Sequence, residues 1–368
     1  MISDYYEVEV PQYVILGSNI LEERLKEINI LKEIKTALII TGPTKTREYG
    51  EIVKNILTDM NIKVFIYSLS NFLEKTQYRY IDEIKSILNT ASQNSVRIIL
   101  GVAGGKVFDI VKVCSKFLSI PYISIPTTAS HDGISSPVIS YPIFEVISSK
   151  IPLKSSRVRP PVAILADTAI VSRSDKRLLY AGCGDLVAKF TAVLDWRLAH
   201  KRVGEKFNEY AAALSVLGFK IIKNRRKIIS LATEKSYRIV LKALIAVGVA
   251  AGFVSSSRPL SGSEHIFSHT LEMLSYKYGF KPALHGEQCG VGTIIMTYLH
   301  GKNWRLIKSI LKEIGAPTNA NELGIEEKYL VEALTISRKT RPERYTILNE
   351  RNMSYEEARK ILCKVEVI

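Results

Sequence analysis

Val96-Arg-Ile-Ile-Leu-Gly-Val-Ala-Gly-Gly-Lys-Val-Phe-Asp109 is the segment that indicates the fold class most directly. Its apolar, β-branched start predicts a buried strand, and Gly104-Gly105 ends that strand in a turn. Over residues 107–118 the apolar side chains then recur at helical spacing. A strand, a glycine turn and a helix in this order form half of a β-α-β unit, so the segment predicts a parallel sheet covered by helices.

The same alternation continues on both sides of this segment. Short apolar runs predict four more strands, at residues 36–41, 62–67, 122–125 and 162–165, and helical patterns follow the first two of these runs, at residues 44–60 and 80–88. Residues 138–151 predict an antiparallel hairpin that turns at Tyr141-Pro142.

After Val171 only helical patterns remain, at residues 176–202, 205–224, 235–254, 263–278, 292–299, 304–314, 326–337 and 354–362. We therefore predict two domains: an α/β domain with a Rossmann-like parallel sheet over residues 1–170, and an all-helical domain over residues 171–368. A chain of 368 residues is long enough for two domains of ordinary size.

The composition describes a globular, basic protein. Fifty-one basic and 36 acidic residues give a formal charge of +15, which is compatible with nucleic acid, an anionic membrane or an anionic small substrate. The four cysteines are widely spaced, as expected in a reducing cytoplasm, and the acidic N-terminus lacks the features of a signal peptide. The most apolar stretch, residues 239–254, contains Lys242 and many small residues, so we expect a packed internal helix and no membrane span.

Two loops at predicted strand ends could hold a phosphate. Ligands of open parallel sheets bind beyond the carboxyl ends of the strands. Gly104 and Gly105 follow one strand and would let backbone N–H groups approach a pyrophosphate at a helix start, although the G-x-G-x-x-G pattern is absent. Residues 126–137 follow the next strand and are rich in hydroxyl groups. Either loop alone would serve as an ordinary turn, but the two together favour a nucleotide.

The helical region contains a possible metal-ligand set. His265 and His269 are four residues apart on one helix face, His285 opens a later segment, and Asp185 follows the break Gly182-Cys-Gly184. One carboxylate and two imidazoles leave an open coordination position, as catalytic metal sites do. Paired histidines also occur by chance, so the residues alone leave both interpretations open. We interpret Cys183 as a packing residue.

Five ordered motifs resemble the sn-glycerol-1-phosphate dehydrogenase family, a branch of the superfamily of metal-dependent glycerol and alcohol dehydrogenases and 3-dehydroquinate synthase. The motifs cover residues 104–109, 127–137, 182–189, 258–265 and 285–292. The resemblance implies a dehydroquinate synthase-like fold, with a nucleotide-binding N-terminal domain and a metal- and substrate-binding C-terminal domain.

The resemblance also assigns roles to residues. It implies cofactor contacts at Gly104, Gly105, Lys106, Asp109, Thr127, Thr128, Ala129, Ser130 and Ser136. It implies metal ligation by Asp185, His265 and His285, and substrate contacts and catalysis by Asp132, Asp185 and His269. Ala103 stands where the family's turn usually has a third glycine.

The implied reaction is the reduction of dihydroxyacetone phosphate to sn-glycerol 1-phosphate with NADH or NADPH, for archaeal membrane phospholipid biosynthesis. One divalent metal, for which zinc suits the ligand set best and iron or nickel are alternatives, would polarise the ketone. We expect a homo-oligomer. Arg258 is a candidate contact for the substrate phosphate, with an ion pair that anchors the helix start as the alternative.

Three other functions remain open from the sequence. A polyol dehydrogenase for unphosphorylated glycerol would share the cofactor loops and the metal ligands, and a dehydroquinate-synthase-like lyase would recycle its NAD. A nucleic-acid-binding protein would explain the charge, but no recognition motif supports it. The end of the second predicted strand, residues 68–71, has no acidic residue to favour NADH over NADPH, so we expect the protein to use both.

Overall fold

The computed structural model describes residues 8–70, 79–254 and 256–368. Its contacts divide the chain into two compact units: Met1–Thr128, Gly133–Arg173 and Gly248–Ser256 form the first, and Ala129–Asp132, Ser174–Val247 and Ser257–Ile368 form the second. The main division therefore lies three residues after the predicted boundary at 170, and two short segments fall in the unit opposite to the one that their position in the sequence suggests.

The first unit contains a six-stranded sheet in which all strands are parallel, in the order β1-β6-β5-β4-β2-β3. The strands are β1 (Tyr13–Gly17), β2 (Thr36–Thr41), β3 (Lys63–Ser68), β4 (Ile98–Ala103), β5 (Tyr122–Pro126) and β6 (Ala163–Asp167). The predicted parallel sheet is confirmed. β1 was not predicted, because its apolar run is short and none of its residues is fully buried.

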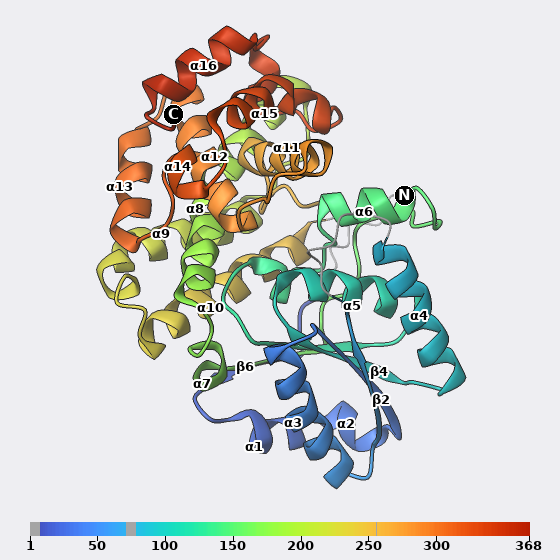
Figure 1. The fold of residues 1–368 in the computed structure, drawn as a ribbon. Coiled ribbons are helices and arrows are strands. Elements are labelled where there is room, and N and C mark those ends of the chain that lie inside the picture. The colour runs from blue at the N-terminus through green and yellow to red at the C-terminus, as the bar shows by residue number, and fades with distance from the viewer. Residues whose placement is uncertain (1–7, 71–78, 255) are drawn as a thin grey trace, which may run out of the picture. The chain divides into compact units, whose positions relative to one another are not determined.

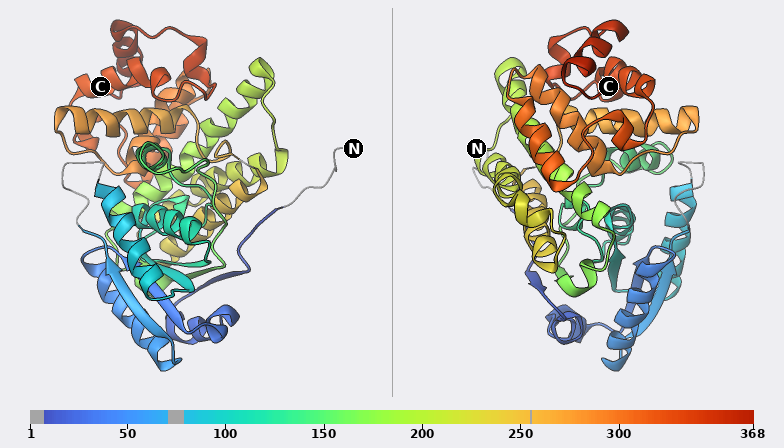
Figure 2. Two further views of the ribbon diagram at one scale, coloured as in Figure 1. Left: turned by 90° about the vertical axis from the view of Figure 1, so that its right-hand side faces the viewer. Right: turned by 60° about the vertical axis from the view of Figure 1, so that its left-hand side comes forward.

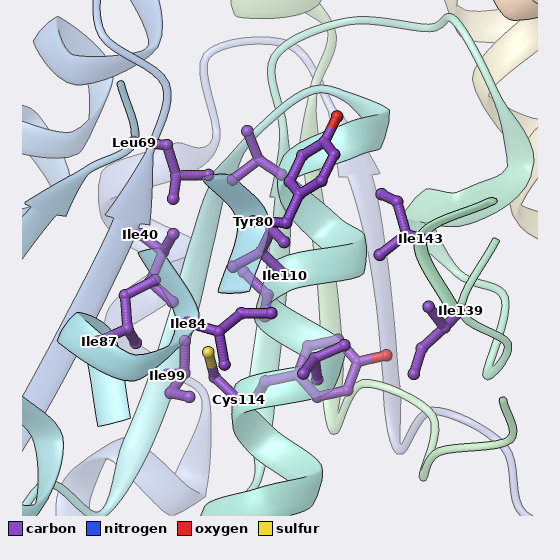
Figure 3. Packing of buried hydrophobic residues seen from close by; sticks show 14 of the residues in the cluster. Ile40, Leu69, Tyr80, Ile84, Ile87, Ile99, Ile110, Cys114, Ile139 and Ile143 are labelled. Atoms are coloured by element: carbon purple, nitrogen blue, oxygen red, sulfur yellow. The ribbon is translucent and has the colours of Figure 1, made fainter. Parts of the chain in front are cut away.

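Helices cover both faces of this sheet (Figures 1 and 2). One face packs against α1 (Leu21–Lys26), α2 (Asn29–Glu33) and α3 (Lys45–Asp59), and the other against α4 (Arg79–Gln93), α5 (Gly105–Leu118) and α6 (Tyr141–Ser148). Successive residues of β2 alternate between the two cores, as a strand buried on both faces requires. Figure 3 shows the core on the α4–α5 side, where Ile84, Ile110 and Cys114 pack together.

The strand order reverses between β2 and β4. The chain runs from β2 outward to β3 and then returns to place β4 on the other side of β2. At such a reversal the loops leaving two neighbouring strands diverge and open a crevice that suits a ligand. The turn from β4 into α5, which contains Gly104 and Gly105, lies at this position.

The predicted hairpin over residues 138–151 is wrong. Residues Tyr141–Ser148 form α6, and only an isolated antiparallel bridge between Val138 and Arg157 is present. Pro142 lies in the first turn of the helix, where its missing N–H group has no intrahelical acceptor and its fixed φ suits the helix. Ile143 and Ile147, one helical turn apart, are buried in the core beside α4 and α5.

Helices are the only regular secondary structure among the described residues of the second unit. Its main helices are α8 (Lys176–Val203), α9 (Glu209–Ile229), α10 (Glu234–Ala250), α11 (Ser263–Tyr278), α12 (His285–Leu299), α13 (Trp304–Ile314), α15 (Glu327–Thr340) and α16 (Tyr355–Lys364), and the short α14 (Ala320–Leu323) precedes α15. α7 (Thr168–Val171) ends the first unit. Most of the predicted helices match these closely. The exceptions are α9, which begins four residues after and ends five residues after the predicted 205–224, and α12, which begins seven residues before its predicted start at residue 292.

The apolar helix expected in the interior is α10, which continues into a 3-10 turn at Phe253. By length and composition alone, Glu234–Phe253 is the one described segment that could cross a membrane, but 67% of its most apolar window is buried inside the protein. Its buried residues include Val240, Leu244 and Val247, as expected for a core helix.

A buried carboxylate at the end of β6 binds the backbone of the segment that follows β1. Asp167, the last residue of β6, accepts hydrogen bonds from the backbone N–H groups of Asn19, Ile20 and Leu21 at 2.8–3.0 Å. It also accepts one from Ala169 at the start of α7. One side chain therefore ties the chain after β1 to the end of β6.

We expect Asp167→Ala to lower the free energy of unfolding by about 2–4 kcal/mol, because several partly buried N–H groups would lose a charged acceptor. Asp59→Ala, which removes an exposed carboxylate from α3 of the same unit, should change it by no more than about 0.5 kcal/mol. Urea and thermal unfolding followed by circular dichroism would measure both. An unchanged midpoint for Asp167→Ala would contradict this role.

Candidate active site

Three helices of the second unit carry the predicted metal ligands. Asp185 lies on α8, His265 and His269 lie on α11, and His285 is the first residue of α12. α8 packs against both α11 and α12, and all four side chains are largely buried. Residues separated by a hundred positions in the sequence are therefore neighbours within one helical unit.

Glycines let α8 and α12 approach until their backbones touch. A Cβ atom on Gly286 would lie 1.8 Å from the carbonyl oxygen of Ala181, and one on Gly184 would lie 2.1 Å from that of Gly286. Any larger residue at either position would force the helices apart. This contact explains why Gly184 precedes Asp185 and Gly286 follows His285: the two glycines set the separation of the two functional side chains.

Asp185 and His265 have the separation of two ligands of one metal ion. His265 Nε2 lies 3.4 Å from Asp185 Oδ1. Two ligand atoms about 2.0–2.1 Å from a tetrahedral zinc ion lie about 3.3 Å apart. The oxygen and nitrogen donors, their burial and their separation thus fit the divalent metal that the sequence motifs imply.

His285 lies beside this pair. Its ring centroid is 5.1 Å from that of His265 and 5.9 Å from that of His269. The donor atoms of His265, His285 and Cys289 lie within 4.8 Å of one another, and the same holds for His131, Asp132 and Asp185. The predicted ligands Asp185, His265 and His285 thus belong to two adjoining donor groups, which the Asp185–His265 contact joins.

Glu264 orients His265. Its buried Oε1 atom lies 2.7 Å from His265 Nδ1 and accepts a hydrogen bond from the backbone N–H of Gly262, while its Oε2 atom accepts one from Thr191. When a metal ion is bound, a carboxylate that accepts from Nδ1–H would leave the Nε2 lone pair for the metal, on the side of the ring that faces Asp185. This second carboxylate is the type of outer partner that histidine ligands of metals commonly have.

Lys189 joins the two predicted catalytic carboxylates. Its fully buried Nζ lies 2.6 Å from Asp185 Oδ1 and 2.7 Å from Asp132 Oδ2, and it donates a hydrogen bond to the carbonyl of Leu260 at 2.9 Å. Asp185 Oδ2 also accepts a hydrogen bond from the backbone N–H of Asp132. Lys189 and this backbone hydrogen bond therefore hold Asp132 and Asp185 close together.

Burial and neighbouring charges lower the pKa values of Asp185, His269 and His285 and raise that of His265. Burial acts to raise the pKa of Asp185, but Lys189 and His265 outweigh it and hold that pKa well below its usual value. Burial and the neighbouring histidines lower the pKa of both His269 and His285. Burial opposes protonation of His265, but its interaction with Cys289 and its hydrogen bonds with Asp185 and Glu264 prevail and raise its pKa. Neutral His285 and ionised Asp185 are the forms that bind a metal ion.

The predicted cofactor turn lies in the first unit. Gly104 is the N-cap of α5 and, as a glycine, has no side chain of its own to cap the helix, and a Cβ atom on Gly104 would lie 2.9 Å from Thr128 Oγ1. The turn after β4 therefore lies directly against the loop after β5, and both flank the N-terminus of a 14-residue helix. Backbone N–H groups and the helix dipole make such a position suitable for a phosphate.

The other predicted cofactor residues lie in different surroundings. Lys106 is exposed on α5, whereas Thr127 and Ser136 are buried in the first unit, and Ala129 and Ser130 belong to the second. Asp109 is buried, lies 3.3 Å from Lys112 Nζ and accepts from the backbone N–H of Ser140. These contacts give Asp109 an internal role that fixes α5 to the segment before α6. Of the strand end at residues 68–71, Asn71 lies outside the described residues.

The structure supports the ion-pair alternative for Arg258. Its guanidinium forms a two-pronged ion pair with Glu205 and donates to the carbonyl of Tyr345 at 2.8 Å. This pair occupies one edge of the guanidinium and links the segment before α11 to the start of α9. The contact between Arg258 and the substrate phosphate stays a prediction.

Comparison with known proteins identifies the family. Residues 16–174 match the family model described as iron-containing alcohol dehydrogenase. The chain is 44% identical over 353 residues to a Pyrococcus abyssi protein named glycerol-1-phosphate dehydrogenase (NAD(P)+), with 96% of this chain and 97% of that protein covered. A protein of the same name from Methanosarcina acetivorans is 44% identical over 341 residues, with 93% and 91% covered.

The chain belongs to the glycerol-1-phosphate dehydrogenase family. The resemblance inferred from the five motifs is thus confirmed, and with it membership of a family of oxidoreductases.

Solved structures confirm the fold class. Glycerol dehydrogenase from Schizosaccharomyces pombe aligns with a TM-score of 0.74 at 15% identity, over 99% of this chain and 91% of that one. A probable glycerol dehydrogenase from Sinorhizobium meliloti aligns with a TM-score of 0.72 at 16% identity, over 98% of both chains. At this level of identity the likeness concerns the fold alone, which is the dehydroquinate synthase-like fold expected for this family.

Two residues of the helical unit that contact the candidate ligands were not predicted from the sequence. Cys289 lies one helical turn after His285, and its Sγ atom is 3.5 Å from His285 Nε2. The spacing of the two residues was the available signal. Glu264, which contacts His265, is the second residue, and its only signal in the sequence was that it directly precedes His265. Cys183, in contrast, is fully buried as the predicted packing residue.

We expect Glu264→Gln to weaken divalent-metal binding by about 10- to 100-fold, because a neutral amide oxygen accepts from His265 Nδ1 more weakly than a carboxylate does, and the amide nitrogen cannot accept from Thr191 in place of Oε2. Competition between the protein and a chromophoric chelator would measure zinc affinity. Glu272→Gln on the same helix should leave affinity at the wild-type value. If Glu264→Gln bound zinc as tightly as wild type, Glu264 would not orient a metal ligand.

We expect Gly286→Ala to disrupt the site, since its Cβ atom would overlap the backbone of Ala181. The variant should unfold at a lower temperature and bind zinc at least about tenfold more weakly, because His285 would move away from Asp185. Gly301→Ala is the control. Gly301 has a positive φ, so alanine there strains the backbone, but no atom lies within 4 Å of the added Cβ, and metal affinity should stay at the wild-type value. Wild-type metal affinity in Gly286→Ala would exclude this role for the helix contact.

Proposed function

We propose that this protein reduces dihydroxyacetone phosphate to sn-glycerol 1-phosphate with NADH or NADPH. The observation that carries the proposal is the assembly of Asp132, Asp185, His265, His269 and His285 in one buried cluster, within a chain that resembles the named relatives over nearly its whole length. The reaction consumes one ketone, one hydride and one proton, and yields the alcohol and the oxidised cofactor.

Asp185, His265 and His285 would hold a divalent metal, for which zinc suits one oxygen and two nitrogen donors best. When bound, the metal would supply Lewis-acid stabilisation of the negative charge that develops on the ketone oxygen. The lowered pKa values of Asp185 and His285 keep these donors in their ligating forms at neutral pH.

The remaining residues would bind and orient the substrate. His269 is buried and its pKa is lowered, so at neutral pH its ring offers one N–H donor and one acceptor to substrate hydroxyl or carbonyl groups. Lys189 holds the carboxylates of Asp132 and Asp185 in fixed positions. Burial of the cluster keeps bulk water away from the carbonyl carbon, so the hydride is delivered to the ketone alone.

The N-terminus of α5 would bind the cofactor pyrophosphate. Gly104 and Gly105 bring backbone N–H groups to the surface of the turn, and Thr128 adds a hydroxyl group beside them. The cofactor supplies the hydride, and the protein contributes its position and orientation.

The proposal also includes a cytoplasmic location, a role in archaeal phospholipid synthesis and assembly as a homo-oligomer. The archaeal sources of the named relatives support the lipid role. Substrate and cofactor are both anions, so the formal charge of +15 would favour their encounter with the protein.

The deciding experiment measures oxidation of NADPH and of NADH at 340 nm with dihydroxyacetone phosphate, followed by chiral analysis of the product. We expect activity with both cofactors, loss of activity after removal of metal by a chelator, and recovery on addition of zinc. Equal rates on unphosphorylated dihydroxyacetone would support the polyol dehydrogenase instead, and absence of net NAD(P)H consumption with either substrate would contradict the proposal.

A further inference from the structure

Three arginines gather beside the N-terminal half of α11. Arg344 donates from Nη1 to the carbonyl of Ser261 at 2.6 Å and from Nη2 to Ser257 Oγ at 2.8 Å. Arg258 donates to the carbonyl of Tyr345, the residue after Arg344. Arg341 is one turn away, and its carbonyl accepts from the backbone N–H of Arg344. The loop that leads into α11 and the segment after α15 thus form one cationic cluster, defined by Arg258, Arg341 and Arg344.

This cluster has fewer carboxylates than guanidinium groups. Glu205 pairs with Arg258, and Glu343, itself 59% exposed, pairs with Arg341 at 2.8 Å. Three arginines against two glutamates leave a net charge of +1. Arg344 is the uncompensated member: it is only 6% exposed, and among the described residues no carboxylate oxygen lies within 4.0 Å of its guanidinium.

A buried guanidinium without a carboxylate partner is costly, because desolvation of a charge is not repaid by hydrogen bonds to neutral oxygens alone. Burial and the neighbouring charges of Arg341 and Arg258 accordingly lower the pKa of Arg344 well below its usual value. Proteins keep such a group where an anionic ligand supplies the missing charge.

The cluster adjoins the predicted substrate residue His269. Thr340, which directly precedes Arg341, lies 2.8 Å from Thr270, which directly follows His269, in a hydroxyl–hydroxyl hydrogen bond. Arg344 donates to the carbonyl of Ser261, which lies two residues before the same helix begins. Residues 340–344 are therefore fastened to α11 on both sides of His269. The charges of Arg341 and Arg344 also contribute to the lowered pKa of His269, after burial and the two neighbouring histidines.

We propose that Arg341 and Arg344 form the subsite for the phosphate group of the substrate, next to His269. This inference rests on the proposed function and names the residues that would distinguish dihydroxyacetone phosphate from its unphosphorylated analogue. A phosphate monoester carries about two negative charges and would more than neutralise the excess charge of the cluster. The planar guanidinium matches two phosphate oxygens at once.

The geometry gives the substrate two separate anchors. His269 lies with its ring centroid 6.2 Å from that of His265 and 5.9 Å from that of His285, so it adjoins the metal-ligand cluster as well as the arginines. A three-carbon substrate with its oxygens toward Asp185 and His265 would place its phosphate toward Arg341 and Arg344. Arg258, paired with Glu205, would support Tyr345 and the segment that carries Arg344.

The test compares Arg341→Gln and Arg344→Lys with the control Arg338→Gln. Arg338 lies on α15, is exposed, and donates to Asn352 outside the cluster. Arg344→Lys keeps the charge but loses the planar fork, and it guards against the misfolding that complete removal of a buried side chain could cause. Each metal-loaded variant would be assayed with dihydroxyacetone phosphate and with dihydroxyacetone, and titrated calorimetrically with inorganic phosphate.

We expect both cluster variants to raise the KM for dihydroxyacetone phosphate and to lower the ratio of kcat/KM for the phosphorylated over the unphosphorylated substrate by about 10- to 100-fold, the range of a lost charge-assisted hydrogen bond. Their affinity for inorganic phosphate should fall by a similar factor, and Arg338→Gln should match wild type in every measurement. Equal losses on both substrates, with unchanged phosphate affinity, would give the arginines a purely structural role and overturn the inference.

The calorimetric titration separates this inference from the proposed function. If the wild-type protein reduced neither ketone but bound phosphate in a manner dependent on Arg341 and Arg344, the proposed reaction would fail and the anion subsite would stand. If it reduced dihydroxyacetone phosphate with an undiminished preference in both variants, the reaction would stand and the subsite would fail.

Discussion

The buried carboxylate of Asp185 is the constraint on which the helical unit depends. An ionised group in the interior of a protein costs several kcal/mol unless its neighbours compensate it. Lys189, His265 and the backbone N–H of Asp132 do so here, and each belongs to a different segment of the chain. The backbone contact at Gly184 and Gly286 brings α12 close enough to add His285. Fold and chemistry are thus coupled, because the same contacts that stabilise Asp185 assemble the donors around it.

Much of this arrangement could be predicted from the sequence, where local pattern and final structure agree. The strand, glycine turn and helix from Val96 onward indicated the parallel sheet, and α11 and α13 were predicted at their observed bounds. The prediction failed where tertiary packing reverses a local preference. Tyr141-Pro142 is common in turns, yet here it starts a helix whose isoleucines reach a core. Glycines after His285 weaken a helix signal, yet they are required because α12 packs on another backbone.

The candidate metal ligands could be named from the sequence, but the neighbouring groups that determine their charge and orientation could not. Asp185, His265 and His285 were identified by spacing and resemblance, whereas the pairing of Glu264 with His265 and of Lys189 with Asp132 depends on three-dimensional contacts. Arg258 shows the same limit. An arginine before a functional helix suits either an anion or an ion pair, and its ion pair with Glu205, fifty-three residues earlier, could not be predicted from the sequence.

The distribution of positive charge suggests how the protein distinguishes its substrate. A formal charge of +15 attracts any anion and cannot select one. Selection requires a cation that is desolvated and lacks a permanent partner. Glu205 and Glu343 each hold one arginine of the cluster, which leaves Arg344 buried without a carboxylate. A neutral polyol would leave that charge uncompensated, whereas a phosphate would pair with it. Sites that leave a buried polar group unpaired in the wrong complex discriminate far more strongly than sites that only match shape. The cationic cluster, more than the metal ligands, would therefore determine which ketone is reduced.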